Sequence, residues 1–145
     1  MTPVTVVTDS AAALPADLVE RHGIKVVPLW LTIGDERHRD GDIALDEVVR
    51  RFAEPITTSA PSPGEFAAVI APACAEGPVL VLTVAARMSS THDSATLAAK
   101  LVAEDGLGGR LGDEHAVAVI DTATAAGAQA LVVLAAAEAA AAGAD

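Results

Sequence analysis

Residues Pro78–Val84 carry the clearest strand signal in the chain, because they form a short apolar run rich in β-branched residues. Apolar residues recur at helical spacing on both sides of this run, from Phe66 to Ala73 and from Ala95 to Val102. Further extended runs are Pro3–Thr8, Ile24–Ile33 and Ala116–Ile120. Strands that alternate with helices in this way predict an α/β fold, with a mostly parallel sheet flanked by helices.

Length and composition indicate one packed domain over residues 1–145. Hydrophobic residues make up 52% of the chain and charged residues 20%, which is typical of a folded, soluble protein. The net charge of −11 and the aromatic content of 2% argue against a nucleic-acid partner, which needs a basic patch and stacking platforms.

No segment is predicted to enter a membrane. Ala123–Ala142 is long and apolar, but alanine contributes little to insertion, so we expect a helix buried in protein and no stable membrane insertion. Met1–Val4 lacks the charged start and apolar core of a signal peptide. The single cysteine, Cys74, is expected to be a small buried side chain. A cytoplasmic location is the expectation that follows.

Familiar catalytic and cofactor motifs do not fit the chain. Ser89, His92 and Asp93 lie too close together on one helix start to converge as a catalytic triad. The chain has no glycine-rich dinucleotide motif and no Walker loop, and Gly106–Gly109 is expected to be a plain turn. The four histidines, His115 among them, show no metal-ligand spacing. We therefore predict no catalytic residues, no cofactor and no metal site.

Polar side chains follow several of the expected strands at the point where each strand ends. These clusters are Thr8-Asp9-Ser10, Ser89-Ser90-Thr91 and Asp121-Thr122. The carboxyl ends of parallel strands share one edge of a sheet, where ligands of open α/β sheets bind. Each cluster alone is better explained as a set of helix caps, and a bracing role for Asp9 is the stronger alternative to ligand contact. Together, the clusters favour a binding edge.

A helix start is marked at Ser62, which is followed by Pro63 and then by Glu65. Ser and Glu at this spacing form a capping box, and proline suits the first helical position. The preceding loop Thr57–Ser59 holds more hydroxyls than one cap requires. Because a helix N-terminus attracts anions, this loop is expected to be receptive to an anionic group.

The segment between the second extended run and this cap is predicted to lie outside the main body. Glu36–Asp42 is charged and rich in turn residues, which predicts an exposed excursion of the chain. Leu45, Val48, Val49 and Phe52 have the spacing of a short amphipathic helix.

These motifs, in this order, resemble the DegV family of bacterial fatty-acid-binding proteins. The matching pieces are Thr8-Asp9-Ser10 with Leu14-Pro15, Val27-Pro28-Leu29, Thr57-Thr58-Ser59-Ala60-Pro61-Ser62 with Glu65-Phe66, Met88-Ser89-Ser90-Thr91 with Ser94-Ala95, and Val119-Ile120-Asp121-Thr122. The resemblance covers the family's N-terminal domain, which a second α/β domain normally follows, with the fatty acid between the two.

The resemblance implies a lipid carrier and not an enzyme. It implies a long-chain fatty acid whose carboxylate is presented to a separate fatty acid kinase for acyl phosphate formation. By the motif, Thr58 and Ser89 would hydrogen-bond the carboxylate, and Ser59 and the backbone around Ser90 and Thr91 would support them. Asp9 and Ser10 complete the expected ligand-binding set.

Two positions depart from the family pattern, and a second interpretation stays open. Ala60 and Ser90 stand where the family usually has Gln and Gly, and Ser90 would be strained if its turn needs a positive φ. The alternative interpretation is a non-enzymatic structural module that holds no lipid. Its apolar fraction and Ala-rich last helix suggest self-association, so a homo-oligomer is possible.

Overall fold

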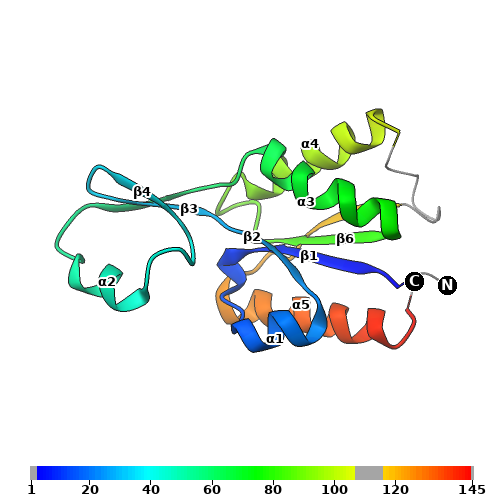
Figure 1. Ribbon diagram of the computed structural model, residues 1–145, viewed down its shortest axis with the longest axis horizontal. Coiled ribbons are helices and arrows are strands. Elements are labelled where there is room, and N and C mark those ends of the chain that lie inside the picture. Colours follow the sequence, from blue (N-terminus) through cyan, green and yellow to red (C-terminus); the bar gives the residue numbers. More distant parts are fainter. Residues whose placement is uncertain (1–2, 107–115, 145) are drawn as a thin grey trace.

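The computed structural model describes residues 3–106 and 116–144 and divides them into a body and a projecting arm (Figure 1). The body holds a four-stranded parallel sheet in the order β2-β1-β6-β7. Its strands are β1 (Thr5–Asp9), β2 (Lys25–Val27), β6 (Val79–Thr83) and β7 (Val117–Asp121). The predicted α/β fold with a mostly parallel sheet is confirmed.

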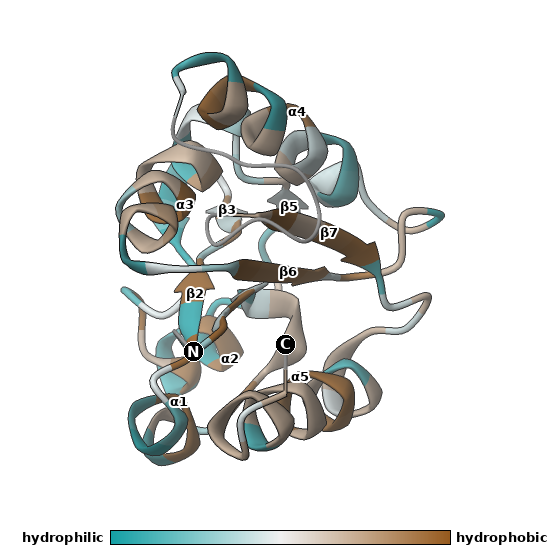
Figure 2. Cartoon of the chain, turned by 90° about the vertical axis from the view of Figure 1, so that its right-hand side faces the viewer, coloured by the Kyte–Doolittle hydropathy of each residue, from teal (hydrophilic) through white to brown (hydrophobic). Residues whose placement is uncertain are grey.

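Two pairs of helices cover the two faces of this sheet. Helices α1 (Ala16–His22) and α5 (Ala126–Ala141) pack on one face, and α3 (Pro63–Glu76) and α4 (Thr91–Glu104) on the other (Figure 1). The central strands β1 and β6 are buried on both sides. In Figure 2, β6 and its neighbour β7 are hydrophobic bands between the helices. β1, β6 and β7 run into α1, α4 and α5, and the arm that follows β2 leads into α3, so the N-termini of these helices lie at the carboxyl edge of the sheet.

The core consists of one apolar layer on each face of the sheet. The layer under α3 and α4 is built around Phe66, Ile70, Val7, Val81 and Ala98. The layer over α1 and α5 is built around Val6, Ile24, Leu82, Val133 and Ala137. Cys74 lies in the first layer as predicted, fully buried, and burial raises the pKa of its thiol.

The arm leaves the carboxyl edge of the sheet and returns to it (Figure 1). It contains a three-stranded antiparallel sheet in the order β4-β3-β5 and one short helix. Its elements are β3 (Trp30–Ile33), β4 (Glu36–Arg39), α2 (Leu45–Arg50) and β5 (Ile56–Ser59).

Two details of the arm differ from the sequence prediction. Glu36–Asp42 was expected to be rich in turns, but Glu36–Arg39 is a strand that pairs with β3. Thr57–Ser59 was expected to be a loop, but it lies in β5 on the other side of β3. In both cases the pairing with β3 supplies the order that the local sequence does not encode.

The short helix α2 was predicted, but most apolar side chains in it and just after it are exposed. Leu45, Val49 and Phe52 expose 78%, 61% and 76% of their surfaces. Among the described residues, no helix is both long and apolar enough to cross a membrane. The expected turn Gly106–Gly109 extends beyond the described residues, and His115 lies outside them.

Candidate functional site

Asp9, at the end of β1, is a buried brace in the structure. It is fully buried, and its Oδ1 accepts hydrogen bonds from the Ala11 N–H at 3.0 Å and from Gln129 Nε2 at 3.2 Å. Its Oδ2 accepts from the Val84 N–H at 2.8 Å. Burial raises the pKa of Asp9, and these N–H donors oppose that rise. Both oxygens are engaged, as the bracing alternative for Asp9 requires.

Gln129 on α5 also belongs to the carboxyl edge of the sheet, and the sequence did not predict this role. Its side chain is fully buried, and Nε2 also donates to Thr8 Oγ1 at 3.2 Å, while Thr8 donates to the Leu82 carbonyl at 2.7 Å. This network ties α5 to the ends of β1 and β6. The signal that could have found it is a lone amide among the alanines of the last helix, because a buried amide needs polar partners.

The second polar cluster forms the start of α4. Ser89 Oγ lies 2.7 Å from Thr91 Oγ1 and accepts the Thr91 N–H at 3.2 Å. Thr91 is buried, Ser89 is half-buried and Ser90 is exposed. Ser90 has φ −74°, so serine occupies this turn without backbone strain. When Thr91 donates its hydroxyl to Ser89, the Ser89 hydrogen stays available for a ligand.

The third cluster braces the ends of β6 and β7. Asp121 Oδ1 accepts the N–H groups of Ala123 at 2.8 Å and Ala86 at 3.1 Å, and these bonds hold the pKa of Asp121 below its usual value. Thr122 donates to the Thr83 carbonyl at 2.8 Å.

His92 does not pair with Ser89, so the exclusion of a catalytic triad is consistent with the structure. Its Nδ1 lies 3.1 Å from Thr83 Oγ1, whereas the Ser89 hydroxyl contacts that of Thr91. In the described ranges, no three His, Cys, Asp or Glu side chains are grouped to hold a metal ion.

The hydroxyls of residues 57–59 lie on an exposed strand at the base of the arm. In register, Thr58 is opposite Leu31 and Ser59 is opposite Trp30. All three side chains are exposed, and because side chains alternate along a strand, Thr58 faces one side of the arm sheet while Thr57 and Ser59 face the other. The structure therefore separates the expected pair Thr58 and Ser59 by face.

The remaining predicted residue, Ser10, connects the body to the arm. Its Oγ accepts the Leu29 N–H at 2.9 Å. A pocket of about 260 Å³ lies beside it and is lined by Ser10, Leu14, Val26 and Asp40, among others.

The predicted site residues of the body thus lie at its carboxyl edge, and Thr58 and Ser59 lie on β5, where the arm returns to that edge (Figure 1). Ser89–Thr91 begins α4, Thr57–Ser59 leads into α3, and Asp9 and Ser10 end β1. Since α3 and α4 pack against each other, their N-termini and the hydroxyls before them belong to the same rim. Fold and rim together define an α/β domain with a hydroxyl-rich carboxyl edge.

Comparison with known proteins gives the family. A family model described as "Uncharacterised protein, DegV family" matches residues 3–145, and the chain belongs to the DegV family. A DegV domain-containing protein of Streptomyces coelicolor is 41% identical over 103 residues, which are 67% of this chain and 36% of that protein.

Solved structures of similar proteins share the fold. One is a DegV family protein from Thermus thermophilus, described by its fatty acid binding, which is 34% identical and superposes with a TM-score of 0.84. The match covers 99% of this chain and 49% of the Thermus thermophilus chain. A stearic acid-binding protein from Eubacterium ventriosum is 29% identical with a TM-score of 0.85, over 98% of this chain and 49% of its own. This chain therefore spans about half the length of these structures.

Proposed function

We propose that this protein binds a long-chain fatty acid and holds its carboxylate with the hydroxyls of Thr58 and Ser89. The observation that carries the proposal is the presence of exposed or half-buried hydroxyls before two neighbouring helices at one rim. The two solved relatives described above are fatty-acid-binding proteins, which supports the same ligand class for this chain.

The physical chemistry divides the work between the two ends of the ligand. Burial of a tail of a dozen or more methylenes, at ~0.8 kcal/mol each, contributes on the order of 10 kcal/mol before costs. A hydrogen bond to a charged group adds ~1.5–3 kcal/mol. The tail therefore provides affinity and the hydroxyls fix the orientation. The local field of two helix N-termini acts at close range, whereas the net charge of −11 is spread out and screened.

In this proposal the protein is a carrier and has no catalytic residues. It presents the carboxylate to a fatty acid kinase, which forms the acyl phosphate, in the cytoplasm. A second α/β domain would complete the tunnel for the tail, as the family resemblance implies. Ser59, Ser90 and Thr91 would support the two hydroxyls, and Asp9 and Ser10 would shape the rim beneath them.

Native mass spectrometry of the natural gene product tests ligand binding directly. We expect a co-purified long-chain fatty acid, and bare protein under mild conditions would count against the proposal. Thr58→Ala and Ser89→Ala should each weaken palmitic acid binding about tenfold or more, since each removes a charge-assisted hydrogen bond. Thr57→Ala is the matched control, because Thr57 is equally exposed but faces the opposite side of β5.

Self-association without a lipid is the second candidate, and exposed apolar side chains favour it. Leu131 on α5 and Phe52 on the arm expose 70% and 76% of their surfaces. Sedimentation of the ligand-free protein over a range of concentrations separates a monomer from a homo-oligomer. A stable oligomer with no bound fatty acid would favour this candidate.

A further inference from the structure

Glu65 links the arm to the body at the start of α3. One carboxylate oxygen, Oε2, accepts the Ser62 N–H at 2.6 Å and so closes the capping box. The other, Oε1, accepts Trp30 Nε1–H at 3.1 Å and pairs with Arg39 Nη2 at 2.5 Å. A capping box needs only the bond to Ser62, so the contacts with Trp30 and Arg39 are additional.

The pairing of the arm strands links Trp30 and Arg39 to Thr58 and Ser59 of β5. Trp30 lies directly opposite Arg39 of β4 on one side and Ser59 of β5 on the other. The next residue of β3, Leu31, is opposite Thr58. A displacement of Trp30 therefore moves Ser59, its partner on β5, and with it the neighbouring Thr58.

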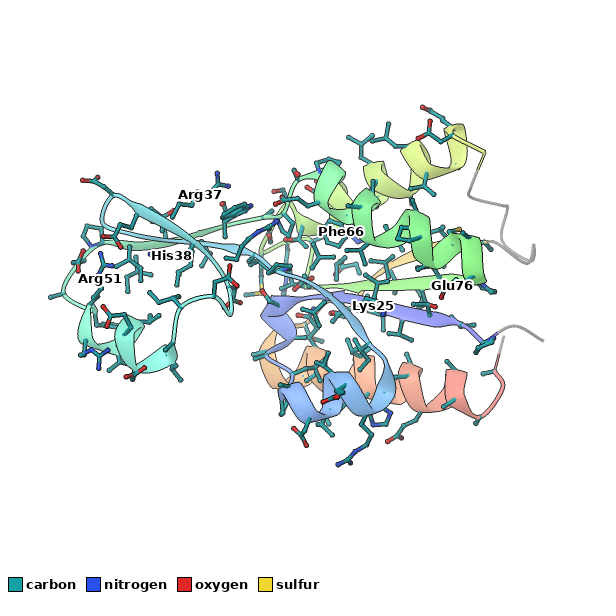
Figure 3. The ribbon with its side chains drawn as sticks, viewed as in Figure 1. Lys25, Arg37, His38, Arg51, Phe66 and Glu76 are labelled. Carbon is teal, nitrogen blue, oxygen red and sulfur yellow. The ribbon has the colours of Figure 1, made fainter. Side chains whose placement is uncertain are left out.

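The indole ring is held from its faces as well as from its N–H. The guanidinium groups of Arg37 and Arg39 lie 3.9 Å and 4.1 Å from the ring centroid, at cation–π distance. In Figure 3, Arg37 projects on one side of the arm, while His38 and Arg51 lie on the α2 side. The Trp30 environment thus combines two contacts within the arm with one contact to the body, the bond to Glu65.

The charge state of Glu65 suits this arrangement. Burial alone would raise the pKa of Glu65, but the Ser62 N–H and hydroxyl, the Arg39 charge and the Trp30 N–H hold it below its usual value. The carboxylate is therefore ionised near neutral pH and can pair with Arg39.

We propose that Glu65 is a positioning residue of the head-group site, which acts through Trp30 and Arg39 to hold Thr58 at the rim beside α4. The assignment rests on the proposed function, because it concerns the carboxylate of the same fatty acid. Glu65 does not touch the ligand in this account; it fixes the strand that does.

The test compares an acid with its ester on the natural gene product. Glu65→Gln keeps an acceptor for the Ser62 N–H but removes the charge that pairs with Arg39. We expect palmitic acid to bind about tenfold more weakly to this variant, and methyl palmitate, which has no carboxylate charge, to bind as it does to wild type. Arg39→Met should have the same effect, and Arg39→Lys should restore part of the affinity.

Trp30 supplies a spectroscopic readout that a purely structural role would not predict. Trp30 is the sole tryptophan of this chain, which has no tyrosine. The Trp30→Phe variant measures any fluorescence that comes from other parts of the natural gene product. Palmitic acid should change Trp30 emission in wild type, and this change should be lost in Glu65→Gln. Ser62→Ala is the control, since it removes the hydroxyl cap and leaves Trp30 and Arg39 in place.

The outcomes separate the two proposals. Equal weakening of acid and ester would show a general structural role for Glu65 and overturn its positioning role, as would an unchanged affinity for the acid. Failure of wild type to bind either palmitic acid or methyl palmitate would overturn the proposed function, and the role of Glu65 with it.

Discussion

The body and the arm are stabilised by different interactions. The body buries apolar side chains on both faces of a parallel sheet, and Phe66 at its centre is fully buried. The arm leaves Phe52 mostly exposed. Arg51 instead ties its elements together, with Nη1 2.6 Å from Glu36 Oε2 and Nε 2.7 Å from Glu54 Oε1.

This difference assigns separate tasks to the two regions. Close-packed apolar layers give the body a fixed geometry, so the rim that carries Ser89 is a rigid support. Partly exposed ion pairs contribute little stability, so the arm that carries Thr58 is held less firmly than the body, to which Ser10 and Glu65 link it. A head-group site built from both regions can therefore be adjusted from the arm while the body stays unchanged.

The two phenylalanines of the chain give the largest expected contrast. Phe66→Ala should destabilise the protein by about 3–5 kcal/mol, because it opens a cavity in the core. Phe52→Ala should change the free energy of unfolding by less than about 0.5 kcal/mol, because its ring is exposed. Denaturant unfolding measures both. Similar losses for the two variants would mean that the arm helix is as well packed as the body.

Two glycines sharpen the comparison with effects of opposite sign. Gly34, between β3 and β4, has φ +59°, and an added Cβ would lie 2.8 Å from Glu54 Oε2. Gly34→Ala should therefore cost about 1–2 kcal/mol and speed hydrogen exchange in the arm alone. Gly64→Ala, in the first turn of α3, meets no close contact and should stabilise by up to about 1 kcal/mol. Hydrogen exchange that rises equally in the body would contradict the separation.

Acid should affect the arm before the body, which is the smallest expected effect. The pKa of Glu65 is lowered on folding, so its contribution to stability is present above its unfolded pKa and is lost as pH falls through the folded value. The pKa of Asp9 is raised, so its contribution is present at low pH and is lost as pH rises through its folded value. Below the ordinary Glu pKa of about 4.3, Trp30 emission should change while the far-ultraviolet circular dichroism holds. Simultaneous changes would show that arm and body respond as one unit.

The body could be predicted from sequence because its elements carry local signals. Pro78–Val84 is a continuous apolar run, and Ser62 with Glu65 marks the start of α3 by cap chemistry alone. The sheet of the arm could not, because Glu36–Arg39 has no alternating apolar pattern and becomes a strand only by pairing with β3. The same pairing turns Thr57–Ser59 from the expected loop into a strand.

The site was predictable in its residue types but not in its contacts. Hydroxyls and carboxylates after strands indicated the carboxyl edge, whereas the bonds of Asp9 to Val84 and Gln129 join segments far apart in the chain. The bond to Gln129 is set by the packing of α5 over β1, and the bond to Val84 by the pairing of β1 with β6. The roles of Thr58 and Ser89 toward a ligand stay predictions.

A crystal structure of the natural gene product with bound palmitic acid tests the central claim most directly. The account predicts one carboxylate within hydrogen-bond distance of both Thr58 Oγ1 and Ser89 Oγ, with the tail leading away from the rim. A carboxylate bound elsewhere, with both hydroxyls turned to their own backbone, would contradict it.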